Sequence, residues 1–375
     1  MIRLSILILL LLLSLLAVLK APTYHLWLMA VAVTEFPLIF VGCTLLMLAT
    51  GFWVTKYQLP GTIIGTIALL LLLSPIFRSY LVSRNLKENL KLAFGTPGIK
   101  NDAQPFSFGK LFKLSYKDVV PSHSITYVSY QDTSLSLDFF PSQAIGKRPC
   151  VIVVHGGSWS SGDSKQLADL NSYLARKGYN VAALNYRLAP KCQTPAPVED
   201  IRNALNYLHK RAGELNIDTN NFVLLGRSAG AQIALLATYT LHNEGLKGVI
   251  DFYGPADMVW GYSVPSNPLV MNSRKVMEDY IGGPYSKIPG KYEACSPILF
   301  VDKTSLPTLI IHGTNDVLVS DEHSRRLNIK LQENGIKHYK LVLPWATHGF
   351  DFNLYGPGGQ LSTYAIEEFL NAVTK

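Results

Sequence analysis

The stretch FVLLGRSAGAQIALLA, residues 222–237, decides the fold of this chain. Its first four residues are apolar and predict a buried strand, and the apolar spacing after Gly230 predicts a helix. The Gly-x-Ser-x-Gly pattern between them is typical of a nucleophile elbow, a strained turn whose glycines let the helix pass close to the strand. The hydroxyl of Ser228 would then be exposed at the carboxyl end of the strand.

Further predicted strands and helices place this elbow in an α/β fold. Two alternating segments, 125–130 and 135–140, predict an antiparallel hairpin. The strands expected after it are 150–154, 180–184, 222–225, 248–253, 308–312 and 339–343, with helices at 169–176, 198–210 and 361–373. Continuous apolar strands separated by helices indicate a mostly parallel central sheet with helices on both faces.

The carboxyl ends of such strands form the active site in open α/β sheets, and two loops there supply partners for Ser228. A serine hydroxyl needs an adjacent base, which His348 can provide, and a carboxylate such as Asp316 would orient the imidazole. Each alone could be an ordinary loop residue, but both follow predicted strands in the chain order serine, aspartate, histidine. Asp321 lies farther from a strand end and is the weaker candidate acid. The remaining histidines considered, which we expect at the surface, are His25, His123, His209, His242, His323 and His338.

The loop HGGSW, residues 155–159, follows another strand and suits an oxyanion hole. We expect the backbone N–H groups of Gly156, Gly157 and Ala229 to stabilise a developing oxyanion, since glycine lets the backbone approach a substrate closely. A plain tight turn is the alternative. His155 is expected to brace the loop.

A long insertion at residues 258–293 carries several aromatic and methionine side chains. Such a segment predicts a cap that holds an apolar acyl or alkyl group, although ordinary packing of helices on the sheet is equally consistent with it. Ser158, Trp159, Trp260 and Tyr262 are the candidate substrate-binding residues.

Three apolar runs, residues 4–19, 36–54 and 61–77, predict transmembrane helices and make residues 1–77 a membrane region. A cleaved signal peptide is the alternative for the first run. Residues 78–123 form a basic linker, because residues 78–117 carry eight basic and two acidic side chains, within a chain of net charge +8. We therefore expect a multi-pass integral membrane protein.

Within the linker, Leu81, Leu86, Leu90 and Phe94 recur at helical spacing. A basic amphipathic helix beside a membrane favours an anionic lipid surface as partner and the cytoplasmic side for the domain that follows. A solvated linker helix is the alternative. The basic residues do not alternate with aromatic ones in the globular part, so the charge does not indicate nucleic-acid binding.

From residue 124 to about 372 the chain resembles the α/β-hydrolases, and more closely the hormone-sensitive-lipase-like and feruloyl-esterase-like carboxylesterases with a His-Gly-Gly oxyanion loop. The stretches that carry the resemblance are HGGSW (155–159), YRLAP (186–190), GRSAG (226–230), HGTND (312–316) and HGF (348–350). The residue before the nucleophile is often acidic in hormone-sensitive-lipase-like members but is Arg227 here, which leaves the subfamily open. Membrane-anchored relatives with a similar layout include the isoprenylcysteine methylesterases.

This resemblance implies a catalytic domain over residues 124–375 that hydrolyses small-molecule carboxylic esters through an acyl-serine, with no metal or cofactor. In that family residues 186–190 and Asp200 hold loops near the site. The same three catalytic residues could cleave amides, as in arylformamidases, or peptides, or transfer the acyl group to another acceptor. A non-catalytic binding protein is a further alternative.

Overall fold

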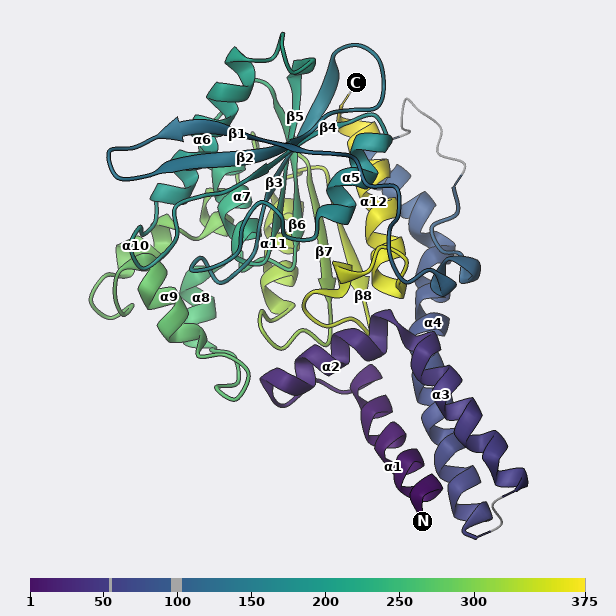
Figure 1. The fold of residues 1–375 in the computed structure, drawn as a ribbon. Helices are drawn as coiled ribbons and strands as arrows, with labels where there is room; N and C mark the ends of the chain where they lie inside the picture. The colour runs from purple at the N-terminus through teal and green to yellow at the C-terminus, as the bar shows by residue number, and fades with distance from the viewer. Residues whose placement is uncertain (54–55, 96–102, 375) are drawn as a thin grey trace.

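The computed structural model describes residues 1–53, 56–95 and 103–374. A single eight-stranded sheet forms the centre of the molecule, in the order β1-β2-β4-β3-β5-β6-β7-β8 (Figure 1). Its strands are β1 (His123–Ser129), β2 (Ser134–Phe140), β3 (Arg148–Val154), β4 (Asn180–Leu184), β5 (Ile217–Arg227), β6 (Leu246–Phe252), β7 (Thr308–Gly313) and β8 (His338–Leu343). The predicted hairpin β1–β2 joins β4 in antiparallel pairing, and the strands from β4 to β8 are parallel.

Helices cover both faces of the sheet, as the alternation of strands and helices predicts. The flanking helices are α5 (Ala168–Arg176), α6 (Ala196–Lys210), α7 (Ala229–Thr240), α11 (Glu322–Glu333) and α12 (Pro357–Val373). The insertion between β6 and β7 forms three short helices, α8 (Met258–Ser263), α9 (Ser273–Ile281) and α10 (Pro289–Ala294). The predicted α/β fold with a mostly parallel sheet is confirmed.

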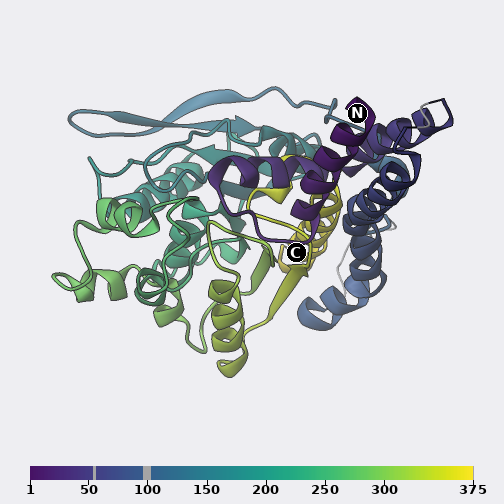
Figure 2. The same cartoon turned by 90° about the horizontal axis from the view of Figure 1, so that it is seen from below.

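The N-terminal region consists of α1 (Ile2–Ser14), α2 (Tyr24–Glu35), α3 (Pro37–Ala49) and α4 (Gln58–Phe94). Helices α1 and α3 lie along the first part of α4 and project with it away from the sheet, whereas the last turns of α4 pack on α12 and β8 (Figure 1). Helix α2 turns away from them and lies over the domain, as the view from below shows (Figure 2).

The prediction of three separate spans is not supported. Among the described residues one helix, α4, is long and apolar enough to cross a membrane. The run predicted at 36–54 forms α3, a helix of 13 residues. Helix α2 and the segment Pro37–Phe52 are long and apolar enough to cross a membrane only if they are taken together, and the two are bent by 85° relative to each other. The run at 4–19 yields a helix of 13 residues followed by a single 3₁₀ turn. Apolar composition alone therefore overstated how many helices have spanning length.

Helix α4 also corrects the predicted linker boundary, because it continues without a break from the third apolar run through Arg78 to Phe94. Leu86, Leu90 and Phe94 are buried in the same cluster as α12, and the Phe94 ring lies 4.8 Å from that of Phe369. The periodic apolar face thus packs on the domain, and the expectation that it lies on lipid is wrong for these three residues. Part of the predicted linker, residues 96–102, lies outside the described residues.

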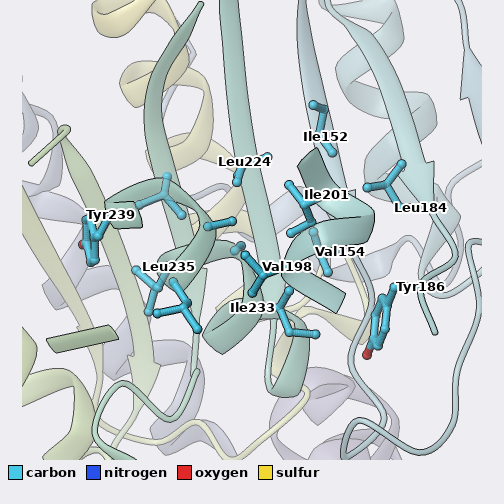
Figure 3. Close-up of a cluster of buried hydrophobic side chains, with 14 of the residues drawn as sticks. Ile152, Val154, Leu184, Tyr186, Val198, Ile201, Leu224, Ile233, Leu235 and Tyr239 are labelled. Carbon is cyan, nitrogen blue, oxygen red and sulfur yellow. The ribbon is translucent and has the colours of Figure 1, made fainter. Parts of the chain in front are cut away.

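The hydrophobic core lies on both faces of the sheet. On one face Ile152, Val154 and Leu224 pack against apolar side chains of α6 and α7, such as Ile201 and Ile233 (Figure 3). Side chains of alternate residues in the same strands point to the opposite face, where they meet α5, α12 and the last turns of α4. This two-sided packing fixes the strands, and with them the loops at their carboxyl ends.

Candidate active site

In the turn that carries Ser228 and joins β5 to α7, the backbone segments approach each other very closely. Ser228 has φ 53° and ψ −120°, a conformation that is uncommon for a residue with a side chain. A Cβ on Gly226 would lie 2.4 Å from the Cα of Ala231, and one on Gly230 would lie 2.3 Å from the carbonyl oxygen of Val154. Both positions therefore require glycine, and the helix passes the strand as closely as the sequence pattern predicts.

The three candidate catalytic side chains come from loops at one edge of the sheet. Ser228 follows β5, Asp316 follows β7, and His348 lies in the loop after β8, residues 344–356, which we call the histidine loop. The Nδ1 of His348 donates a hydrogen bond of 2.7 Å to Oδ2 of Asp316. No hydrogen bond between Ser228 and His348 is present among the described residues, while Ser228 and Asp316 line the same cavity. The structure thus contains the hydrogen bond between the candidate base and the carboxylate that would orient it.

The Asp316 carboxylate is buried and accepts four hydrogen bonds. Its Oδ1 accepts from the backbone N–H groups of Leu318 and Val319, each at 2.9 Å, and its Oδ2 also accepts from Nε2 of His312 at 3.2 Å. Burial alone would raise the pKa of Asp316, but the charge of His348 and the hydrogen bonds from the two histidines outweigh it and hold this pKa well below its usual value. The carboxylate therefore stays ionised at neutral pH.

His312 is a supporting residue that the sequence reasoning missed. Its Nε2 faces two acceptors, Asp316 Oδ2 and the carbonyl oxygen of Val319 at 3.1 Å, so this nitrogen carries the proton. Its Nδ1 then accepts from the Ser324 hydroxyl at 2.6 Å. The position four residues before Asp316, at the end of β7, was the signal available in the sequence.

The loop after β3 is held by side chains on both sides. His155 stacks on Tyr186 with ring centroids 4.3 Å apart, and the Tyr186 hydroxyl donates to the His155 carbonyl oxygen. His155 therefore braces the loop, as expected. The backbone N–H of Gly156 donates to Oε1 of Gln166 at 2.7 Å, so it is engaged within the protein. Gly157 takes φ 120°, which glycine adopts readily.

A cavity of about 250 Å³ opens at Ser228. Its polar end is formed by Ser228 and Asp316 together with Ser158, and Ala229, the first residue of α7, lies beside them. Trp159 lines the cavity but is 5% exposed, because its indole stacks on a neighbouring ring and donates to a buried glutamine. The cap segment contributes the apolar side chains of Val264, Pro265, Met271, Val276 and Met277, together with two serines, Ser266 and Ser273. The part of the cavity wall that the cap forms is thus mostly apolar.

Two candidate substrate contacts do not lie in this cavity. Trp260 packs edge-on against His323, with ring centroids 4.8 Å apart, and the Tyr262 hydroxyl donates to the Glu278 carboxylate at 2.7 Å. Helix α8 has six residues, and its turns direct these rings to α11 and α9. The expectation that His323 lies at the surface is also wrong: it is 5% exposed, and burial lowers its pKa to about 3.

Arg227, the departure from the family pattern, forms a buried ion pair with the histidine loop. Its Nε donates to Oδ2 of Asp351 at 2.5 Å, and the other carboxylate oxygen accepts from the Tyr253 hydroxyl. The Tyr253 ring in turn lies 4.2 Å from that of His348. The residue before the nucleophile therefore fixes the loop that carries the candidate base.

The N-terminal region contacts the same loop. The indole N–H of Trp27 in α2 donates to the carbonyl oxygen of His348 at 2.9 Å. Glu35, at the end of α2, accepts from the backbone N–H of Gly358 at 2.9 Å, and its carbonyl accepts from the Asn353 side chain at 3.1 Å. Nothing in the sequence signalled that α2 belongs to the surroundings of the candidate base.

Within the part of the chain that the structure describes, no group of three or more His, Cys, Asp or Glu side chains could hold a metal ion. The site therefore consists of a nucleophile candidate, an ordered histidine–aspartate pair and an adjoining cavity.

Comparison with known families gives this arrangement its context. The BD-FAE family matches residues 137–331, from β2 into α11. The chain belongs to the BD-FAE family. The matched region includes Ser228 and Asp316, while the histidine loop lies beyond it.

Curated relatives match well over half of the chain. Esterase LipQ of Mycobacterium tuberculosis is 27% identical over 247 residues, which cover 62% of this chain and 58% of that protein. The isoprenylcysteine alpha-carbonyl methylesterase ICME of Arabidopsis thaliana is 25% identical over 267 residues, which cover 67% of this chain and 60% of that protein. This chain thus spans about three fifths of the length of these relatives.

The structural neighbours define the fold. A bacterial heroin esterase superposes with a TM-score of 0.59 at 22% identity, covering 71% of this chain and 88% of that one. The thermophilic esterase Est2 of Thermogutta terrifontis superposes with a TM-score of 0.54 at 19% identity, covering 66% and 89%. The predicted α/β-hydrolase fold is confirmed.

Proposed function

We propose that this protein is a serine hydrolase that cleaves small-molecule carboxylic esters. The observation that carries the proposal is the His348–Asp316 pair, bonded at 2.7 Å, at the same edge of the sheet as the strained Ser228 turn. Membership of the BD-FAE family and the esterases among the relatives support it. An ionised, fully bonded carboxylate is suited to orient an imidazole and to stabilise its protonated form.

In the proposed reaction His348 Nε2 takes the proton of the Ser228 hydroxyl as its oxygen attacks the ester carbonyl. The resulting oxyanion accepts hydrogen bonds from the backbone N–H groups of Ala229 and Gly157. Gly156 is a weaker candidate donor because Gln166 already accepts its N–H. The tetrahedral intermediate collapses, the C–O bond breaks, and the alcohol leaves with the proton from His348. Water, deprotonated by His348, then releases the acid from acyl-Ser228.

The catalytic pair of Ser228 and His348 needs to come into hydrogen-bonding distance for the first proton transfer. Such contacts often tighten only in the complex with substrate. The glycines fix the backbone of the turn at Ser228. The adjustment therefore falls to rotation of the Ser228 hydroxyl and to the imidazole, whose other nitrogen stays anchored on Asp316.

We further propose that α4 holds the protein at a membrane. The amino-terminal part of α4 is apolar and of spanning length, and α1 and α3 pack along it. Arg78 and Arg84 lie where α4 meets the domain, and basic residues at the end of a span favour the cytoplasmic side. The hydrolase domain would then lie in the cytoplasm.

Ester hydrolysis by the purified full-length protein in detergent tests the proposal. Ser228→Ala should abolish turnover of p-nitrophenyl butyrate while circular dichroism stays unchanged, and Ser134→Ala, at an exposed position on β2, should leave turnover as in the wild type. Wild-type turnover in Ser228→Ala would exclude this nucleophile. Comparison of an ester with the anilide of the same acid separates esterase from amidase activity.

A further inference from the structure

The orientation of α2 indicates which side of the domain faces the membrane proposed above. The α2–α3 pair is bent by 85°, and α3 packs along α4. If α4 crosses a bilayer, α2 lies nearly parallel to the membrane surface, in the position of an interfacial helix. Because Trp27 of α2 bonds to the loop after β8, the carboxyl ends of the strands face α2 and hence the membrane (Figure 1).

Helix α2 exposes an apolar surface on its free side. Tyr24 is 46% exposed and Leu28 45% exposed, and Leu26 and Met29 are exposed as well, with His25 as the one exposed imidazole among them. Residues 21–34 contain no Asp, Glu, Lys or Arg. A surface of this kind is favoured at the boundary between lipid headgroups and acyl chains.

The loop between α8 and α9, residues 264–272, hydrogen-bonds to the start of α2. The backbone N–H of Tyr24 donates to the carbonyl oxygen of Leu269 at 3.1 Å, and the Asn267 side chain donates to the carbonyl oxygen of Pro22 at 3.1 Å. Leu269 is 69% exposed and Val264, which lines the cavity, is 54% exposed. Residues 258–273 also lack Asp, Glu, Lys and Arg.

Tyr24, Leu26 and Leu28 of α2 and Val264 and Leu269 of the cap are thus exposed apolar side chains on two segments that hydrogen-bond to each other, and we call them the apolar rim; Val264 places it beside the cavity. We propose that this rim rests on the lipid bilayer and that the protein takes its substrate from there, as a lipophilic carboxylic ester dissolved in the membrane. The mostly apolar wall that the cap gives the cavity, including Met271 and Met277, suits such a molecule. This inference rests on the proposed esterase function and names its substrate class.

Two esters of the same acid test the inference with full-length protein in phosphatidylcholine nanodiscs. Hexadecyl acetate partitions into the bilayer, whereas p-nitrophenyl acetate reaches the site from water. The variants are Leu269→Asp and Leu28→Asp, whose side chains lie outside the cavity lining and whose backbone bonds remain. Ile145→Asp is the control, since Ile145 is 99% exposed on the loop before β3, at the opposite edge of the sheet from the site.

We expect each rim variant to lower the rate of acetate release from hexadecyl acetate by about fivefold or more, because a charge removes the favourable burial of one leucine side chain. Hydrolysis of p-nitrophenyl acetate should stay within about twofold of the wild type, and Ile145→Asp should change neither rate.

An equal loss with both esters, an unchanged rate with hexadecyl acetate, or a wild type that cleaves only the water-soluble ester would overturn the inference. Failure of the wild type to cleave either ester would instead contradict the proposed esterase function, so the two failures are distinguishable.

Discussion

The nucleophile turn and the histidine loop hold their catalytic candidates by different means. The turn at Ser228 depends on neighbours in sequence, since Gly226 and Gly230 admit the close passage of α7. The histidine loop depends on side chains distant in sequence, because Arg227 bonds to it across 124 residues and Trp27 across 321. A short motif can therefore specify the nucleophile, whereas the base is positioned by contacts from across the whole chain.

The largest effect should come from the bond that orients the base. Asp316→Asn should lower kcat for p-nitrophenyl butyrate by about 10³–10⁴-fold, because the amide favours the wrong imidazole tautomer while the geometry is kept. Steady-state kinetics measure this loss. Asp321→Asn, at the weaker candidate acid, is the matched control and should keep kcat within about twofold. A strong loss in Asp321→Asn with little in Asp316→Asn would reverse the assignment.

The buried ion pair between the turn and the loop should come next. Arg227→Met leaves the Asp351 carboxylate buried without its cation and should lower the free energy of unfolding by about 3–5 kcal/mol. Urea unfolding in detergent measures this change. Arg211→Met removes an exposed pair with Glu214 and should cost less than about 1 kcal/mol. Similar small losses in both variants would show that the loop does not depend on Arg227.

The burial of His323 should make the free energy of unfolding depend on pH. The folded-state pKa is lowered to about 3 from the usual 6.5, so between these values the unfolded chain binds a proton that the folded protein does not. Stability contributed by neutral His323 is present above pH 6.5 and is lost as the pH falls below it.

His323→Gln should therefore reduce the loss of unfolding free energy between pH 7 and pH 5 by about 2 kcal/mol. Urea unfolding at the two pH values measures this difference. His209→Gln, at an exposed position of α6, should leave the wild-type pH dependence intact. An unchanged pH dependence in His323→Gln would mean that the pKa of His323 is not lowered in the folded protein.

The smallest expected effect tests the contact from the N-terminal region. Trp27→Phe keeps an aromatic ring but removes the hydrogen bond to the His348 carbonyl, so kcat should fall by about threefold to tenfold with KM little changed. Trp53→Phe is the control, because Trp53 is 79% exposed and directly follows the 3₁₀ turn Thr50–Phe52 after α3. A lower melting temperature with unaltered kcat would assign Trp27 a purely structural role.

The sheet and the order of the candidate catalytic residues could be predicted from the sequence because each signal is local. The strand predicted at 180–184 is observed with the same bounds, and Ser228, Asp316 and His348 each follow a strand as expected. Helix α11 was not predicted, since its sequence is largely charged and polar.

The N-terminal region shows what sequence patterns leave open. The spacing of Leu86, Leu90 and Phe94 predicted a helical apolar face correctly, but periodicity does not distinguish lipid from α12 as the partner of that face. Likewise Glu35 gave no sign that it would accept a bond from Gly358, because the contact exists only once α2 lies on the domain. Long-range partners of this kind depend on the assembled fold.

The most direct test is covalent labelling of the nucleophile. Full-length protein incubated with a fluorophosphonate probe should carry one phosphonyl group on Ser228, mapped by mass spectrometry of the peptide that contains residues 226–230, with ester hydrolysis lost in proportion to labelling. Asp316→Asn should be labelled far more slowly. A protein that hydrolyses esters but is labelled at another residue, or is not labelled, would contradict the assignment of Ser228 as the nucleophile.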